Sequence, residues 1–176
     1  LVVPPSFICL KNLKDMYYRQ TMDGKCVFGE SRKRSYSYPD DFSAENIQFM
    51  GCERECPGML EIVKKLEGLA STDYTDQISF LGNISELAQN AVSSGHANKV
   101  EAEFLGVRDN KGQPVTLDEL LGDEPIKLHD RAVGVLLPSK EILSSIKYGW
   151  FVRMDIDQVL KSKTNIGRFL LAANAS

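Results

Sequence analysis

Four cysteines are the residues of this 176-residue chain with the clearest capacity for chemistry, and all lie in its first 56 residues. Cys52 and Cys56 form a close pair, whereas Cys9 and Cys26 stand alone in apolar stretches. Buried thiols act as small hydrophobic side chains, and the sequence favours this structural role. One or two disulfides, a zinc site and a reactive thiol remain as alternatives. Zinc needs four ligands and only one short cysteine pair is present, so we assign no metal ligands.

Cys56 is the best-placed residue for a reactive thiol. Pro57 suits the first position of a helix, which puts Cys56 at the cap. The free N–H groups and the dipole of a helix N-terminus stabilise a thiolate over a thiol. Cys52 would then be the resolving partner, and His96 or His129 would be the base. The pattern therefore indicates a thiol-dependent hydrolase or oxidoreductase as one enzymatic alternative.

Glu101 and Glu103 are the second group that could carry chemistry. The alternation of residues 100–107 predicts a strand, which would place both carboxylates on one face, roughly 6.5–7 Å apart. Paired carboxylates can divide acid and base roles. Together with Tyr18-Arg19 and Ser35-Tyr36-Ser37, which precede it in that order, the Glu-x-Glu spacing resembles the elements of ADP-ribosyltransferases. The resemblance implies an NAD-using transferase built on Glu103, while a solvent-exposed strand edge is the alternative.

A polar stretch over residues 29–42 is the best candidate for an exposed loop. It carries the basic run Arg32-Lys33-Arg34 and two tyrosines, Tyr36 and Tyr38. Long loops in compact domains are often functional, so we interpret these five residues as a contact surface for a protein partner. The net charge of −3 argues against general nucleic-acid binding. The chain has no 18-residue apolar run, so we predict no membrane span.

Apolar periodicity and turn residues predict an α+β (mixed α/β) fold for residues 1–176, taken as a single compact domain. Helices are expected over residues 12–20, 57–70, 75–92, 116–121 and 139–147, and in a final helix that Asp155 caps. Strands are expected over residues 2–10, 25–28, 100–107, 132–137 and 150–154. Asp109-Asn110-Lys111-Gly112 indicates a tight turn. The expected architecture is a small mixed sheet packed by four to five helices.

The composition is that of an ordinary soluble domain, and no strong catalytic motif is present. We therefore expect a non-catalytic protein-interaction or regulatory domain. An enzyme is the alternative, either a thiol-dependent one that uses Cys56 or an ADP-ribosyltransferase-like one that uses Glu103 and Glu101. No cofactor is assigned.

Overall fold

The computed structural model of the chain describes residues 1–30, 46–69 and 77–175. Contacts between Cα atoms divide the chain into two compact units. Unit 1 comprises Leu1–Pro4 and Lys14–Glu101, and unit 2 comprises Pro5–Leu13 and Ala102–Ser176. Each unit combines a small sheet with helices, which confirms the α+β class. The expectation of one domain over residues 1–176 stays a prediction.

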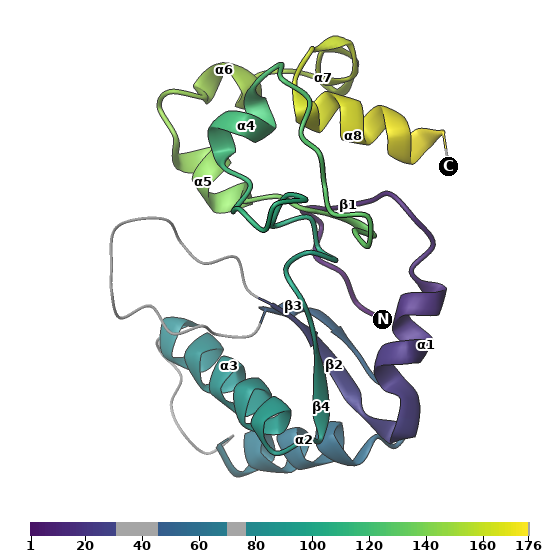
Figure 1. Cartoon of the computed structure of the whole chain (residues 1–176). Coiled ribbons are helices and arrows are strands. Elements are labelled where there is room, and N and C mark those ends of the chain that lie inside the picture. The colour runs from purple at the N-terminus through teal and green to yellow at the C-terminus, as the bar shows by residue number, and fades with distance from the viewer. Residues whose placement is uncertain (31–45, 70–76, 176) are drawn as a thin grey trace. The chain divides into compact units, whose positions relative to one another are not determined.

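Unit 1 is built on a three-stranded mixed sheet with the strand order β3-β2-β4 (Figure 1). The central strand β2 (Cys26–Gly29) pairs antiparallel with β3 (Asn46–Gly51) and parallel with β4 (Ala97–Val100). Strands flank β2 on both edges and helices cover its faces, so all of its residues are buried. The helical elements of unit 1 are α1 (Lys14–Thr21), η1 (Met22–Gly24), α2 (Pro57–Leu69) and α3 (Gln77–Ser93).

Alternate residues of β2 supply the core under α2 and α3. Cys26 and Phe28 pack with Ile62 of α2 and with Ala88 and Ala91 of α3. Side chains two positions apart on a strand share a face, and the small alanines allow a helix to approach that face closely. α1 lies on the other side of the sheet (Figure 1). The candidate pocket described below lies on the α2–α3 side.

Unit 2 contains a two-stranded antiparallel sheet in which β1 (Phe7–Cys9) pairs with β5 (Gly134–Leu136). Five short helices complete the unit: α4 (Leu117–Leu121), α5 (Ser139–Ser144), α6 (Gly149–Val152), α7 (Ile156–Lys161) and α8 (Asn165–Asn174). Capping side chains explain where three of these helices begin. Thr116 and Asp155 form capping boxes with Glu119 and Gln158, and the Thr164 side chain accepts a hydrogen bond from Gly167 N.

Asn165 is the most buried polar side chain of unit 2, with 1% of its surface exposed. Its amide donates hydrogen bonds to the carbonyls of Glu119 (2.8 Å) and Glu124 (2.6 Å). Its Oδ1 accepts from the backbone N–H of Ile126 at 3.3 Å. A buried amide is tolerated only when its donors and acceptors are paired. Asn165 therefore fixes the irregular segment after α4 against the start of α8.

The predicted strand over residues 100–107 is wrong beyond its first residue. β4 ends at Val100, and the chain then forms turns in which Val107 N donates to the Ala102 carbonyl. Gly106 has a φ of 61°, a conformation outside any strand. A Cβ atom there would lie 2.4 Å from the Gly134 carbonyl oxygen. Packing against β5 therefore overrides the local alternation of side chains.

Several other elements differ from the sequence prediction. The predicted strand over residues 150–154 is helix α6, which follows directly after the Tyr148 turn. The predicted final helix is two helices, because Thr164 caps α8 after α7 has ended. α2 begins at Pro57 as predicted. The apolar spacing of Leu60, Val63 and Leu66 predicts its inward face, whereas the helix buries Ile62 and leaves Leu60 and Val63 exposed. β3 has no counterpart among the predicted strands.

Other predictions are confirmed. The turn at Asp109 is present, with Asp109 Oδ1 accepting hydrogen bonds from the backbone N–H groups of Lys111 and Gln113. The predicted helix over residues 116–121 is α4, and the predicted strand over residues 132–137 contains β5. None of the helices in the described part of the chain is long and apolar enough to cross a membrane.

Gly106 and Gly112 provide a matched test of the turn before β5. Both have positive φ, but a Cβ atom at Gly112 would meet no atom within 4 Å. Gly112→Ala should cost about 1 kcal/mol in free energy of unfolding through the left-handed conformation alone. Gly106→Ala should cost at least ~2 kcal/mol more, because its Cβ overlaps the β5 backbone. Urea unfolding measures both, and equal losses would contradict the close approach.

Candidate functional site

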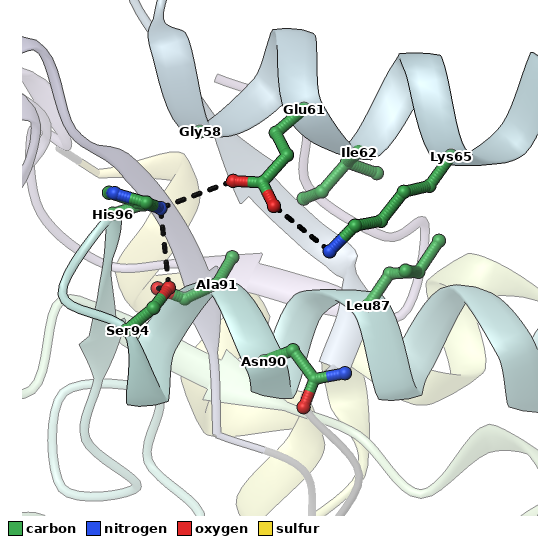
Figure 2. A pocket seen from close by; sticks show the side chains of 9 residues that line it. All are labelled: Gly58, Glu61, Ile62, Lys65, Leu87, Asn90, Ala91, Ser94 and His96. Atoms are coloured by element: carbon green, nitrogen blue, oxygen red, sulfur yellow. Dashed lines mark hydrogen bonds and ion pairs between the residues drawn. The ribbon is translucent and has the colours of Figure 1, made fainter.

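A pocket of about 180 Å³ lies between α2 and α3 in unit 1 (Figure 2). Two helical stripes form most of its wall, each with the spacing i, i+3, i+4, i+7 that defines one helix face. α2 contributes Gly58, Glu61, Ile62 and Lys65. The second stripe runs along α3 into the turn after it, and His96 follows that turn. Its members are Leu87, Asn90, Ala91 and Ser94.

A small polar network stands at the mouth of this pocket. The Glu61 carboxylate lies 2.9 Å from Lys65 Nζ and 3.3 Å from His96 Nδ1. Ser94 Oγ lies 3.3 Å from the same His96 nitrogen (Figure 2). The hydrogen bond and the positive charge of Lys65 lower the pKa of Glu61, and His96 adds to this effect. Glu61 is therefore a carboxylate held between two basic side chains.

This arrangement does not form a nucleophilic triad. In a Ser-His-acid relay the hydroxyl contacts one ring nitrogen and the carboxylate contacts the other. Here Ser94 and Glu61 both approach Nδ1 of His96. The histidine therefore cannot pass a proton from Ser94 while Glu61 orients its opposite side. The geometry suits binding of a ligand better than nucleophilic catalysis.

Three of the four cysteines belong to the core beneath α2. Cys26 is fully buried, Cys56 is 3% exposed, and Cys52 packs beside them. Cys26 Sγ donates to the His96 carbonyl at 3.6 Å. Burial, with a contribution from neighbouring Cys56, raises the pKa of Cys26 to about 12, and burial also raises the pKa of Cys52. Both environments favour the protonated thiol, as expected for structural cysteines.

The four cysteines are free thiols, and Cys9 is exposed. No group of three or more metal-ligating side chains occurs within residues 1–30, 46–69 and 77–175. Cys56 does precede the first residue of α2, and its carbonyl accepts the N–H of Leu60. Its side chain, however, is turned into the core. The helix start is as predicted, but the access that a reactive Cys56 needs is lacking.

The paired glutamates do not have the predicted geometry. Glu101 directly follows the end of β4. Glu103 lies in the next turn, where its carbonyl accepts a hydrogen bond from Gly106 N. The prediction that both side chains share one face of a strand is therefore wrong. Arg19 lies in the last turn of α1, whereas the resemblance to ADP-ribosyltransferases implies an arginine on a strand. Catalytic roles for Glu101 and Glu103 stay a prediction without support from the local structure.

The predicted contact loop lies mostly outside the described residues. This applies to all five of its proposed binding residues, Arg32, Lys33, Arg34, Tyr36 and Tyr38. Their role stays a prediction.

A surface that the sequence analysis missed lies in unit 2. Five large apolar side chains are exposed within fourteen consecutive residues, and we call them the exposed apolar segment. They are Leu143, Ile146, Trp150, Val152 and Ile156. In the predicted helix over residues 139–147, the apolar spacing of Ile142, Leu143 and Ile146 predicts that all three face inward. Instead, Leu143 is 70% exposed and Ile146 is 99% exposed. Helix α5 ends at Ser144, so Ile146 lies outside it and its side chain no longer follows the helical spacing.

Two hydrogen bonds attach the exposed apolar segment to helix α4. The Tyr148 hydroxyl and Lys147 Nζ, the latter at 2.9 Å, both donate to the carboxylate of Asp118 on α4. Ile142 and Tyr148 are buried in the unit 2 core, and Phe151 packs against that core. The segment is thus a fixed part of the fold that turns one set of apolar side chains inward and another outward.

This chain matches no protein-family model, and no curated protein or solved structure shows a detectable similarity to it. Function is therefore inferred from the two surfaces described above.

The thiol environments predict an order of alkylation. Iodoacetamide should modify Cys9 first and Cys52 more slowly, because exposure decreases in that order. Cys26 and Cys56 should react only when the protein unfolds, since both are buried. Peptide mass spectrometry over time measures this order, with a sample in guanidinium chloride as the control. Labelling of Cys56 as fast as that of Cys9 would contradict the buried position.

Lys65 and Lys64 provide a matched test of the polar network. Lys65→Met should raise the pKa of Glu61, and Lys64→Met should leave it unchanged, because Lys65 is the main cause of the lowered value. Carboxyl carbon chemical shifts measured over a pH titration report this pKa. A lowered pKa stabilises the fold above the ordinary glutamate value of about 4.3, and this contribution is lost as the pH falls through the lowered value. Equal pKa values in both variants would rule out the Lys65 contact.

Proposed function

We propose that this chain is a non-catalytic protein-binding domain and that the exposed apolar segment of unit 2 is its contact surface. The observation that supports the proposal is the exposure of five large apolar side chains within residues 143–156. Isolated exposed apolar side chains are normal on a protein surface, whereas clusters mark interaction sites. Trp150 is among them, and tryptophan is enriched at the energetic centres of interfaces.

Four of the five exposed side chains, all except Ile156, come from α5, α6 and the connection between them. α5 and α6 pack together, and Ile146 lies in the short connection between them. Trp150 packs edge-on against Phe151 with ring centroids 5.8 Å apart, which limits its rotation. Side chains that are already ordered lose little conformational entropy when a partner binds. This pre-organisation suits a surface that recognises a partner without rearrangement.

The charges around the surface are nearly balanced. From Ser139 to Ile156 the chain carries three basic residues, Lys140, Lys147 and Arg153, against two acidic residues, Glu141 and Asp155. Lys147 is also paired with Asp118 of α4 at 2.9 Å. Charge complementarity therefore contributes little to the choice of partner, whereas the exposed leucine, isoleucine and tryptophan favour apolar anchors. We therefore expect a protein segment that presents apolar side chains, such as an amphipathic helix.

The partner can be found and the surface tested in one experiment. A photo-crosslinking amino acid at position 146 captures the neighbouring protein, and the same group at exposed Met22 in unit 1 is the control. The captured protein is then purified, and its affinity is measured by calorimetry. The Leu143→Ser/Ile146→Ser double variant should bind at least about tenfold more weakly, because two apolar contacts are lost. Leu171→Ser, at an exposed position of α8, is the matched control and should bind normally.

The thermal stability of the double variant should change little, since both side chains are exposed. Equal affinity of the double variant and the Leu171→Ser control would refute this surface. Flotation with anionic vesicles that requires Leu143 and Ile146 would instead assign the segment to membranes. Loss of binding only on alanine replacement of the basic and tyrosine residues of loop 29–42 would move the contact surface to that loop.

A further inference from the structure

The exposed apolar segment presents enough apolar surface for one half of a specific interface. Leu143, Ile146 and Ile156 are 70%, 99% and 62% exposed. Trp150 and Val152 are each 44% exposed. At roughly 200 Å² for a large side chain that is fully exposed, these fractions amount to about 600 Å². The smallest specific interfaces bury about 600 Å² on each partner, so these five side chains alone reach that limit.

The charges of this segment allow it to face a copy of itself. From Ser139 to Ile156, three basic residues are offset by two acidic residues and by Asp118 of α4, which is paired with Lys147. The surface therefore carries no net charge, whereas the whole chain carries −3. A surface with charge of one sign repels its own copy and selects a partner of opposite charge. A neutral apolar surface lacks that barrier to self-association.

The segment also presents the side chains that it requires of a partner. In a two-fold dimer the same surface of both copies meets, so each apolar anchor of one copy packs on an apolar anchor of the other. Leu143, Ile146 and Trp150 come from α5, α6 and the connection between them, and these two helices contact each other. Both copies would therefore bring a surface that is already ordered, which keeps the entropy cost of association low.

We propose that the partner of the exposed apolar segment is the same segment of a second copy of this chain, in a two-fold symmetric dimer. This inference rests on the contact surface proposed above and names its partner. The two copies together bury about 1,200 Å², the lower limit of standard interfaces. We therefore expect a reversible monomer–dimer equilibrium with a dissociation constant of about 10 µM.

Sedimentation equilibrium of the full chain tests the association. From about 2 to 200 µM, the weight-average mass should rise from 19.6 kDa toward twice that value. The Leu143→Ser/Ile146→Ser double variant should associate at least about a hundredfold more weakly, because a two-fold interface loses each anchor twice. Leu171→Ser should associate as the unaltered chain does. A chain that stays monomeric throughout, or a double variant that associates normally, would overturn the proposal.

A cross-linking measurement shows which surfaces meet. A photo-crosslinking amino acid at position 146, in a mixture of ¹⁵N-labelled and unlabelled chains, should link one copy to residues 143–156 of the other. The same group at exposed Met22 should give no such link. Cross-links from position 146 to residues of unit 1 in the other copy would contradict a two-fold dimer through this segment.

The two proposals fail in different ways. If the purified chain is monomeric and position 146 captures a different protein, the second copy is ruled out while the contact surface in unit 2 stands. If the chain is monomeric and position 146 captures no protein, both proposals are wrong. Self-association that the double variant abolishes supports both.

Discussion

A Cβ atom at Gly58 would lie 2.7 Å from the His96 carbonyl oxygen, closer than real Cβ atoms come to such a neighbour, and 3.1 Å from Cys26 Sγ, which is also a tight contact. The first turn of α2 thus rests directly on the start of β4, and only glycine permits this approach. One helical turn later, Glu61 comes within 3.3 Å of the His96 ring. The pocket, the contact between Glu61 and His96 and the packing of the buried thiols beneath α2 all depend on this close approach.

Features with a local cause could be predicted from the sequence. The start of α2 at Pro57, the cap of α7 at Asp155 and the turn at Asp109 each follow from side chains within a few residues. The α+β class follows from the alternation of helical and strand-like patterns. The placement of cysteines in the core followed from the apolar stretch around Cys26, although Cys9, also in such a stretch, is exposed.

Features with a distant cause could not be predicted. The side chains of residues 100–107 do alternate as in a strand, but Gly106 packs on the β5 backbone and the chain forms turns instead. Glu61 and His96 are 35 positions apart, so no local pattern shows that they meet. The helical spacing from Ile142 predicts that Ile146 faces inward, whereas α5 ends two residues before Ile146. At Gly106, tertiary packing decides between local conformations of similar energy.

The antiparallel pairing of β1 with β5 joins Phe7 to Leu136, about 130 residues later in the chain. During synthesis at roughly 5–20 residues per second, β1 leaves the ribosome on the order of ten seconds before its partner exists. Residues Lys14–Glu101, which form nearly all of unit 1, are synthesised in that interval. The short strand must therefore stay unpaired while a complete neighbouring unit folds, and the late closure of so long a loop favours slow maturation of unit 2.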